Sequence, residues 1–191
     1  MSNSSQAFGL LPRQTDSGAP YSGKLRKYAV ASNYGTSVFP GDPVIITGTA
    51  TQDAGGDYCP NVAVATAAGS NYTTGVVVSV VPLTEADNVY IPANTGGFVL
   101  VEDDPLALFE VMASGSDAVT DIGNTASYNA GGGGSTILGR SSFEWDSATV
   151  GTGTQLVLEG VKNEKNNDLS SANPILIVRI NLHQKRNTTG V

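Results

Sequence analysis

The stretch Leu106-Ala107-Leu108-Phe109-Glu110-Val111 alternates between side chains suited to a core and side chains suited to a surface. Near the other end of the chain, Val178-Arg179-Ile180-Asn181-Leu182 shows the same alternation. A period of two is typical of antiparallel strands that are buried on one face. No window of about eleven residues or more carries a convincing helical stripe. The two stretches therefore predict an all-β fold.

Further β-like runs begin at Leu25 and are separated by clusters of Gly, Pro, Asn and Asp. The predicted strands cover residues 25–31, 44–47, 62–65, 75–81, 88–91, 98–101, 106–112, 155–161 and 175–182. Residues 25–191 are thus expected to form a single all-β domain, a compact antiparallel barrel or sandwich. Residues 117–122 predict one helical turn. The Gly-rich run at 129–135 predicts an exposed hairpin tip, with a mobile loop or hinge as the alternative.

Residues 1–24 predict an extended N-terminal arm, because Gly and Pro punctuate them and few apolar residues recur with a period. Three large apolar side chains on this arm have no evident core of their own and are expected to anchor it on its own body or on a neighbouring subunit. The candidate contact residues of the arm and the start of the first strand are Phe8, Leu10, Leu11, Arg13, Lys24, Arg26 and Lys27.

Charge is distributed very unevenly. Between Tyr28 and Gly139 the chain has no lysine or arginine, although eleven carboxylates lie between Asp42 and Asp121. All ten basic residues lie outside this stretch, and the formal net charge is −7. Such a body offers no cations to a nucleic acid, and its charge disfavours an anionic membrane surface. We therefore expect neither nucleic acid nor membrane as a partner.

The chain also lacks the features of export. Residues 1–6 are polar, without the charged start and apolar run of a signal peptide, and no apolar run is long enough for a membrane-spanning helix. Its one cysteine, Cys59, has no partner for an internal disulfide. Synthesis in a reducing host cytoplasm is the expectation.

Residues 134–141 have the outline of a phosphate-binding loop, with Arg140 in place of the lysine. That loop requires a buried strand before it and a helix after it. Here glycines precede the segment, and Phe143-Glu144-Trp145 does not begin a helix. We interpret the match as coincidental and expect no cofactor.

Other groups that could carry chemistry have simpler structural interpretations. Glu102, Asp103 and Asp104, near Glu110, could act on a glycoside or bind a hard cation, but Asp104-Pro105 between two strands favours a turn. The single histidine, His183, is expected to be solvated at a strand end. Trp145 could stack on a sugar, although a lone tryptophan more often caps a core or fills an interface. We therefore expect no catalytic residues and no metal site.

Three segments in chain order resemble a known family. The first holds Ala7-Phe8-Gly9-Leu10-Leu11-Pro12, then Gly18-Ala19-Pro20-Tyr21-Ser22-Gly23 and the strand with Tyr28. The second is Thr36-Ser37-Val38-Phe39-Pro40-Gly41-Asp42-Pro43-Val44. The third runs from Val101 to Val111 and is followed by Asp121-Ile122-Gly123-Asn124. Together they resemble the structural cement or head-decoration proteins of tailed bacteriophages.

The resemblance implies a non-enzymatic virion protein that coats the outer surface of a capsid and bridges neighbouring capsomers. Its partners would be the major capsid protein and further copies of itself, with a homotrimer favoured over a dimer because capsid lattices offer threefold positions. A head-fibre, tail or receptor-binding module is the first alternative. A carboxylate-based glycosidase around Glu102 and Glu110 is the second.

Overall fold

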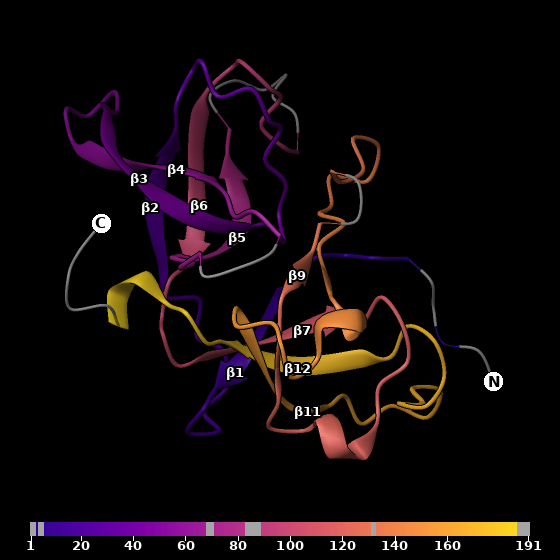
Figure 1. The fold of residues 1–191 in the computed structure, drawn as a ribbon. Coiled ribbons are helices and arrows are strands. Elements are labelled where there is room, and N and C mark those ends of the chain that lie inside the picture. The colour runs from indigo at the N-terminus through magenta and orange to yellow at the C-terminus, as the bar shows by residue number, and fades with distance from the viewer. Residues whose placement is uncertain (1–2, 4–5, 68–70, 83–88, 131–132, 187–191) are drawn as a thin grey trace.

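The computed structural model describes residues 3, 6–67, 71–82, 89–130 and 133–186 and is built almost entirely of strands and loops (Figure 1). Within these ranges there is no α-helix, only three short 3-10 turns. The prediction of an all-β fold is confirmed. The strands form two bodies, which we call the barrel and the sheet body, and Figure 1 shows one above the other.

The barrel is closed by five strands in the order β2-β4-β3-β5-β6. They are β2 (Leu25–Val30), β3 (Pro43–Gln52), β4 (Tyr58–Val64), β5 (Gly75–Val81) and β6 (Gly97–Glu102). Most pairs are antiparallel, but β2 and β4 close the barrel through a parallel contact between Ala29 and Asn61. Gly75 allows a close crossing, because a Cβ there would lie 2.1 Å from the Glu102 carbonyl oxygen.

The sheet body is a five-stranded antiparallel sheet in the order β1-β7-β12-β11-β8. Its strands are β1 (Leu11–Thr15), β7 (Ala107–Met112), β8 (Thr125–Ala126), β11 (Leu156–Val161) and β12 (Ile175–Ile180). The two stretches that predicted the fold meet here, because Phe109 of β7 pairs with Val178 of β12. This pairing places both alternating segments at the centre of one sheet.

Smaller elements complete the sheet body and the C-terminal region. A two-stranded ribbon joins β9 (Tyr128–Asn129) to β10 (Glu144–Trp145). The 3-10 turns are η1 (Val119–Asp121), η2 (Ser147–Thr149) and η3 (Gln184–Arg186). The helical turn predicted over residues 117–122 corresponds to η1.

Each body has its own hydrophobic core. Tyr28, Val44 and Val99 are among the buried residues of the barrel. Phe109 and Trp145 belong to the larger cluster of the sheet body, which also takes in Ala65 and Val76 from the barrel side. The two bodies therefore pack directly against each other.

Two boundary predictions need correction. A strand was expected over residues 88–91, but Val89 and Tyr90 lie in a bend and Ile91 makes only an isolated bridge to Val38; residue 88 lies outside the described residues. A division of the chain at residue 24 does not match the observed sheet either. The barrel, residues 25–102, lies between β1 and β7, two strands that pair with each other.

Candidate binding surface

The N-terminal segment is extended, as predicted, but it is built into the protein. Leu10 is 0% exposed and belongs to the core of the sheet body. Its backbone N–H donates to the Gly41 carbonyl oxygen at 3.0 Å. Gly9 makes this approach feasible, since its φ is +75° and a Cβ would lie 2.5 Å from that of Ser141. Leu10 therefore anchors the segment on its own body, which is the first of the two alternatives expected from the sequence.

The next residues form an edge strand. Leu11 pairs with Glu110 and Thr15 with Ala107, which fixes β1 on β7. Arg13 donates to the Glu110 carboxylate at 2.7 Å. Phe8 is half-buried and Leu11 is 46% exposed, so both side chains leave apolar surface exposed to solvent.

The remaining predicted contact residues lie at the start of the barrel. Lys24 and Arg26 are exposed. Lys27 pairs with Asp53 at 2.5 Å and lies 4.6 Å from the centre of the Phe98 ring. The hydrogen bond between Lys27 and Asp53 raises the pKa of the lysine and lowers that of the carboxyl. Of the four cations among the predicted contact residues, Lys24 and Arg26 are therefore the ones presented outward.

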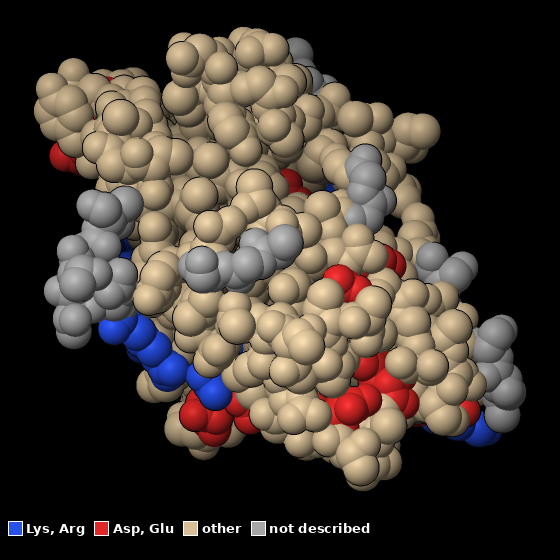
Figure 2. Space-filling view, in the orientation of Figure 1, with Lys and Arg blue, Asp and Glu red and all other residues tan. Residues whose placement is uncertain are grey.

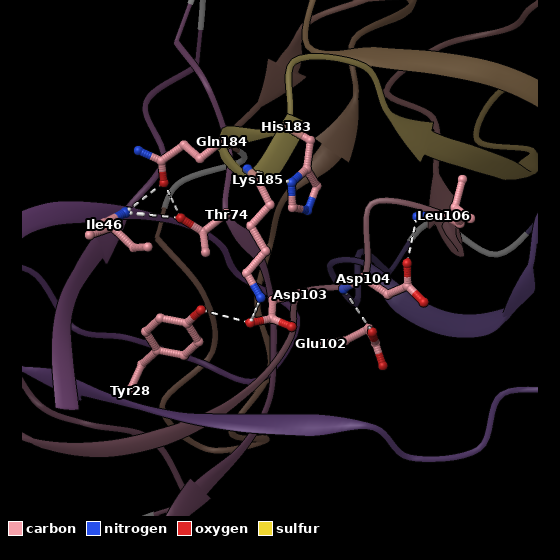
Figure 3. Close-up of polar contacts among 10 residues, drawn as sticks. All are labelled: Tyr28, Ile46, Thr74, Glu102, Asp103, Asp104, Leu106, His183, Gln184 and Lys185. Atoms are coloured by element: carbon pink, nitrogen blue, oxygen red, sulfur yellow. Dashed lines mark hydrogen bonds and ion pairs between the residues drawn. The ribbon is translucent and has the colours of Figure 1, made fainter. Parts of the chain in front are cut away.

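The carboxylates of the turn between β6 and β7 have structural partners (Figure 3). Glu102 is 2% exposed and accepts from the Asp104 backbone N–H at 3.0 Å. Asp104 accepts from the Leu106 N–H at 2.9 Å, which is the turn expected from Asp-Pro. Asp103 accepts from the Tyr28 hydroxyl at 2.7 Å and pairs with Lys185. The described part of the chain contains no cluster of His, Cys, Asp and Glu that could hold a metal.

Glu110 is also engaged, since Arg13 and Lys162 both pair with it, at 2.7 and 3.1 Å. The nearby carboxylates thus hold strands and turns together. This geometry gives no support to acid and base catalysis around Glu102 and Glu110.

His183 is not a solvated strand-end residue, as the sequence led us to expect; it is 1% exposed. Its Nδ1 accepts from the Lys185 backbone N–H at 3.1 Å. Among the described residues its Nε2 has no hydrogen-bond partner. Burial, with the nearby Lys185 charge as a smaller cause, lowers the pKa of His183 to about 4. The imidazole is therefore neutral at pH 7 and belongs to the packed junction of the two bodies.

The residues around His183 form what we call the latch, residues 183–186. Figure 3 shows the Gln184 side chain directed at Ile46 and Thr74, and Lys185 reaching toward Asp103 beside Tyr28. Gln184 Oε1 accepts from the Ile46 N–H at 2.8 Å and from the Thr74 hydroxyl, while the Gln184 N–H donates to the Thr73 carbonyl oxygen at 2.9 Å. The latch follows β12 of the sheet body and fastens it to the barrel.

Trp145 takes no part in an exposed platform. It is 0% exposed, and its Nε1 donates to Asp117 at 3.0 Å. Asp117 also accepts from the Ser147 hydroxyl at 3.0 Å. Of the two interpretations of Trp145, the structure supports the core and excludes stacking on a sugar from this position.

The segment that outlines a phosphate-binding loop has a different shape. Of the Gly-rich run at 129–135, residues 131–132 lie outside the described residues. Ser135 and Arg140 form an antiparallel bridge, and no helix follows it. Ile137 at the tip is 91% exposed and Leu138 is 49% exposed. The sequence alone did not predict this apolar tip, although a pair of large aliphatic residues between Gly134 and Gly139 indicates it.

Charged atoms are sparse on the face drawn in Figure 2, where neutral residues cover most of the surface. Lys and Arg atoms form a short run at the left and a small group at the lower right. No helix in the described ranges has the length and apolar character needed to cross a membrane.

Comparisons of the chain with protein-family models, with curated proteins and with solved structures find no significant match.

Proposed function

We propose that the protein is a virion structural protein: a cement or decoration protein that binds the outer surface of a phage capsid and bridges neighbouring capsomers. The observation that carries this proposal is that two β bodies are joined by a shared hydrophobic cluster and by hydrogen bonds. Leu10 and the latch both join the barrel to the sheet body. A unit with two joined lobes suits a bridging role, because two modest contacts made together bind far more tightly than either alone.

The engaged carboxylates and the small share of charged residues on the face drawn in Figure 2 are consistent with this role. Glu102, Asp103, Asp104 and Glu110 all hold structural contacts. The outward-facing groups of the N-terminal region, Leu11 with Lys24 and Arg26, remain the proposed capsid contacts. The major capsid protein and further copies of this chain are the proposed partners. The proposed function requires no catalytic activity of this protein.

The proposal is tested by adding the purified protein to assembled capsids that lack it. We expect co-sedimentation with the capsids and a higher temperature of capsid disruption, measured by the release of packaged DNA. A Lys24→Glu/Arg26→Glu variant, both positions being exposed, should bind more weakly and with a smaller salt dependence. Capsids that break at the same temperature with and without bound protein contradict the cement role.

One feature favours the alternative of a receptor-binding module. A pocket of about 330 Å³ lies beside the ribbon and η2, and its polar lining includes Ser127, Asp146, Thr149 and Thr152. Hydroxyl and carboxylate groups that line a pocket can hydrogen-bond a saccharide. Titration calorimetry with soluble host-surface oligosaccharides separates the two functions, because a cement protein should give no heat of binding.

A further inference from the structure

The exposed apolar tip of residues 135–140, which we call the knob, is a preformed structure. The Ser135 N–H donates to the Arg140 carbonyl oxygen at 2.8 Å, and the Arg140 N–H returns a bond at 3.3 Å. Within this closed turn the Leu138 N–H donates to the Ser135 hydroxyl at 3.2 Å. Ile137 thus projects from a turn whose backbone is already fixed, which lowers the entropic cost of binding.

The base of the knob is fixed as well. The N–H groups of Gly133 and Gly134 both donate to the Ser142 hydroxyl, at 3.1 and 2.9 Å, and this hydroxyl donates to the Ala130 carbonyl oxygen at 3.1 Å. A Cβ on Gly134 would lie 2.6 Å from the Phe39 ring. The knob is therefore braced against Phe39, which lies between β2 and β3 of the barrel.

Val89 enlarges the apolar surface of the knob. It is 61% exposed, and a Cβ on Gly139 would lie 2.2 Å from its Cγ2 atom, so the two residues are in close contact. With Ile137 and Leu138 it gives three exposed aliphatic side chains on this part of the surface. Arg140, also exposed, adds one cation at the base of the turn.

An apolar pocket of about 330 Å³ opens beside the base of the knob. Its walls come from both bodies and include Tyr34, Val64, Ala67, Ala130 and Phe143. Gly133, one residue before the knob's own base glycine, also lines it. Knob and pocket consequently lie close together on the molecule. Ile137 is 91% exposed and is not among the residues that line the pocket, so the tip does not fill the pocket of its own chain.

The two features complement each other chemically. An aliphatic tip matches apolar walls, and the cation Arg140 on the knob is opposite in sign to Asp42, the one charged residue of the pocket lining. We propose that the knob of one copy inserts into the pocket of a second copy, and that the pair is related by a two-fold axis. With a two-fold axis, each copy inserts its knob into the pocket of the other. Both contact sites of each copy are then used, so the assembly stops at a dimer and does not extend into a filament. The occupant of the pocket is thus a second copy of this chain.

The proposal is tested by sedimentation equilibrium of the full chain over a concentration series, without any capsid. We expect a reversible monomer–dimer equilibrium. Ile137→Asp should raise the dimer dissociation constant by at least about tenfold, as expected for the loss of a central apolar anchor. The matched control is Val119→Asp, which changes an exposed aliphatic residue on η1 and should leave the dissociation constant unchanged.

A second measurement traps the contact directly. In a Cys59→Ser background, Ile137→Cys and Ala67→Cys are introduced together, and mild oxidation should give a disulfide-linked dimer; each single cysteine should give much less. Mixing Ile137→Asp with Ala67→Trp should restore one of the two contacts and part of the association. A chain that stays monomeric, a dimer unaffected by Ile137→Asp, or a trimer overturns the two-fold knob-to-pocket arrangement. None of these outcomes depends on capsid binding.

Discussion

Gln184 Oε1 accepts a hydrogen bond from the Ile46 backbone N–H at 2.8 Å, which joins the end of the chain to a strand of the barrel. Thr74 hydrogen-bonds to the same side-chain oxygen and accepts from the same N–H at 3.0 Å. One amide side chain therefore accepts from two groups of the barrel, the Ile46 N–H and the Thr74 hydroxyl.

Replacing Gln184 by alanine should destabilise the protein by about 1–3 kcal/mol, because partly buried polar groups lose a partner. For a chain of this length that corresponds to a fall in melting temperature of roughly 2–4 °C per kcal/mol. Thermal unfolding followed by circular dichroism measures it, with the exposed Gln6→Ala as the control. Equal melting temperatures for Gln184→Ala and Gln6→Ala would show that the latch does not hold the bodies together.

Leu10 and Leu11 provide a matched pair in the N-terminal segment. Leu10→Ala removes a fully buried side chain and should cost about 2–5 kcal/mol, whereas Leu11→Ala, at a half-exposed site, should cost under about 1 kcal/mol. Deleting residues 1–12 should likewise lower the melting temperature. Chemical denaturation of the three variants measures these effects. A deletion variant as stable as the full chain would restore the picture of a detached arm.

His183 should make the protein less stable in mild acid. Its pKa is lowered to about 4 in the folded protein, against an ordinary value of 6.5, so the unfolded chain takes up the proton first. The stabilisation is complete above pH 6.5 and is lost as the pH falls toward 4, by at most about 3 kcal/mol. Stability curves between pH 7 and 4 should be flatter for His183→Asn, which can keep an acceptor for the Lys185 N–H.

Asp42 should have the opposite effect on the pH dependence of stability, since it should make the protein less stable as the pH rises. Burial raises the pKa of its carboxyl to about 6, and this outweighs the hydrogen bonds from the Phe39 N–H and Ser141 that favour the charged form. The folded protein therefore holds a proton that the unfolded chain releases near pH 3.8. Its contribution is present below that pH and is lost, up to about 3 kcal/mol, as the pH rises through 6.

The Asp42→Asn variant separates the pH dependence of stability that is due to Asp42 from the one that is due to His183. The amide stays neutral, so the variant should gain stability relative to the natural protein as the pH rises from 4 to 7. The double variant with His183→Asn tests independence, because each residue should contribute its own pH dependence. A difference between Asp42→Asn and the natural protein that stays constant over this range would contradict the raised pKa.

Several strands could be predicted closely from the sequence, since their apolar runs end at turn residues. The run at 75–81 coincides with β5 (Gly75–Val81), and the run at 25–31 exceeds β2 by one residue. β1 escaped prediction because Pro12 and Arg13 interrupt any apolar pattern; only its pairing with β7 makes it a strand. The parallel contact of Ala29 with Asn61 depends on barrel closure, which no local pattern encodes.

The candidate site was harder to predict from the sequence, because its contacts join residues that are far apart in the chain. Asp104-Pro105 correctly indicated a turn, because that chemistry is local. The burial of His183 and Leu10 depends on residues far away in the chain, such as Thr73 and Gly41. Contacts of this kind become visible only when the two bodies are placed together.

The position of the barrel between β1 and β7 sets an order for folding during synthesis. We expect residues 25–102 to close into a barrel first, because all five of its strands lie within this stretch, whereas β1 must wait for β7 and the sheet core must wait for β12. The chain enters and leaves the barrel at adjacent points, because Leu25 pairs with Glu102 and Thr15 pairs with Ala107. The barrel is thus an insertion between two paired strands, and a replacement domain would need closely spaced ends and a substitute for Ala65 and Val76 in the sheet-body core.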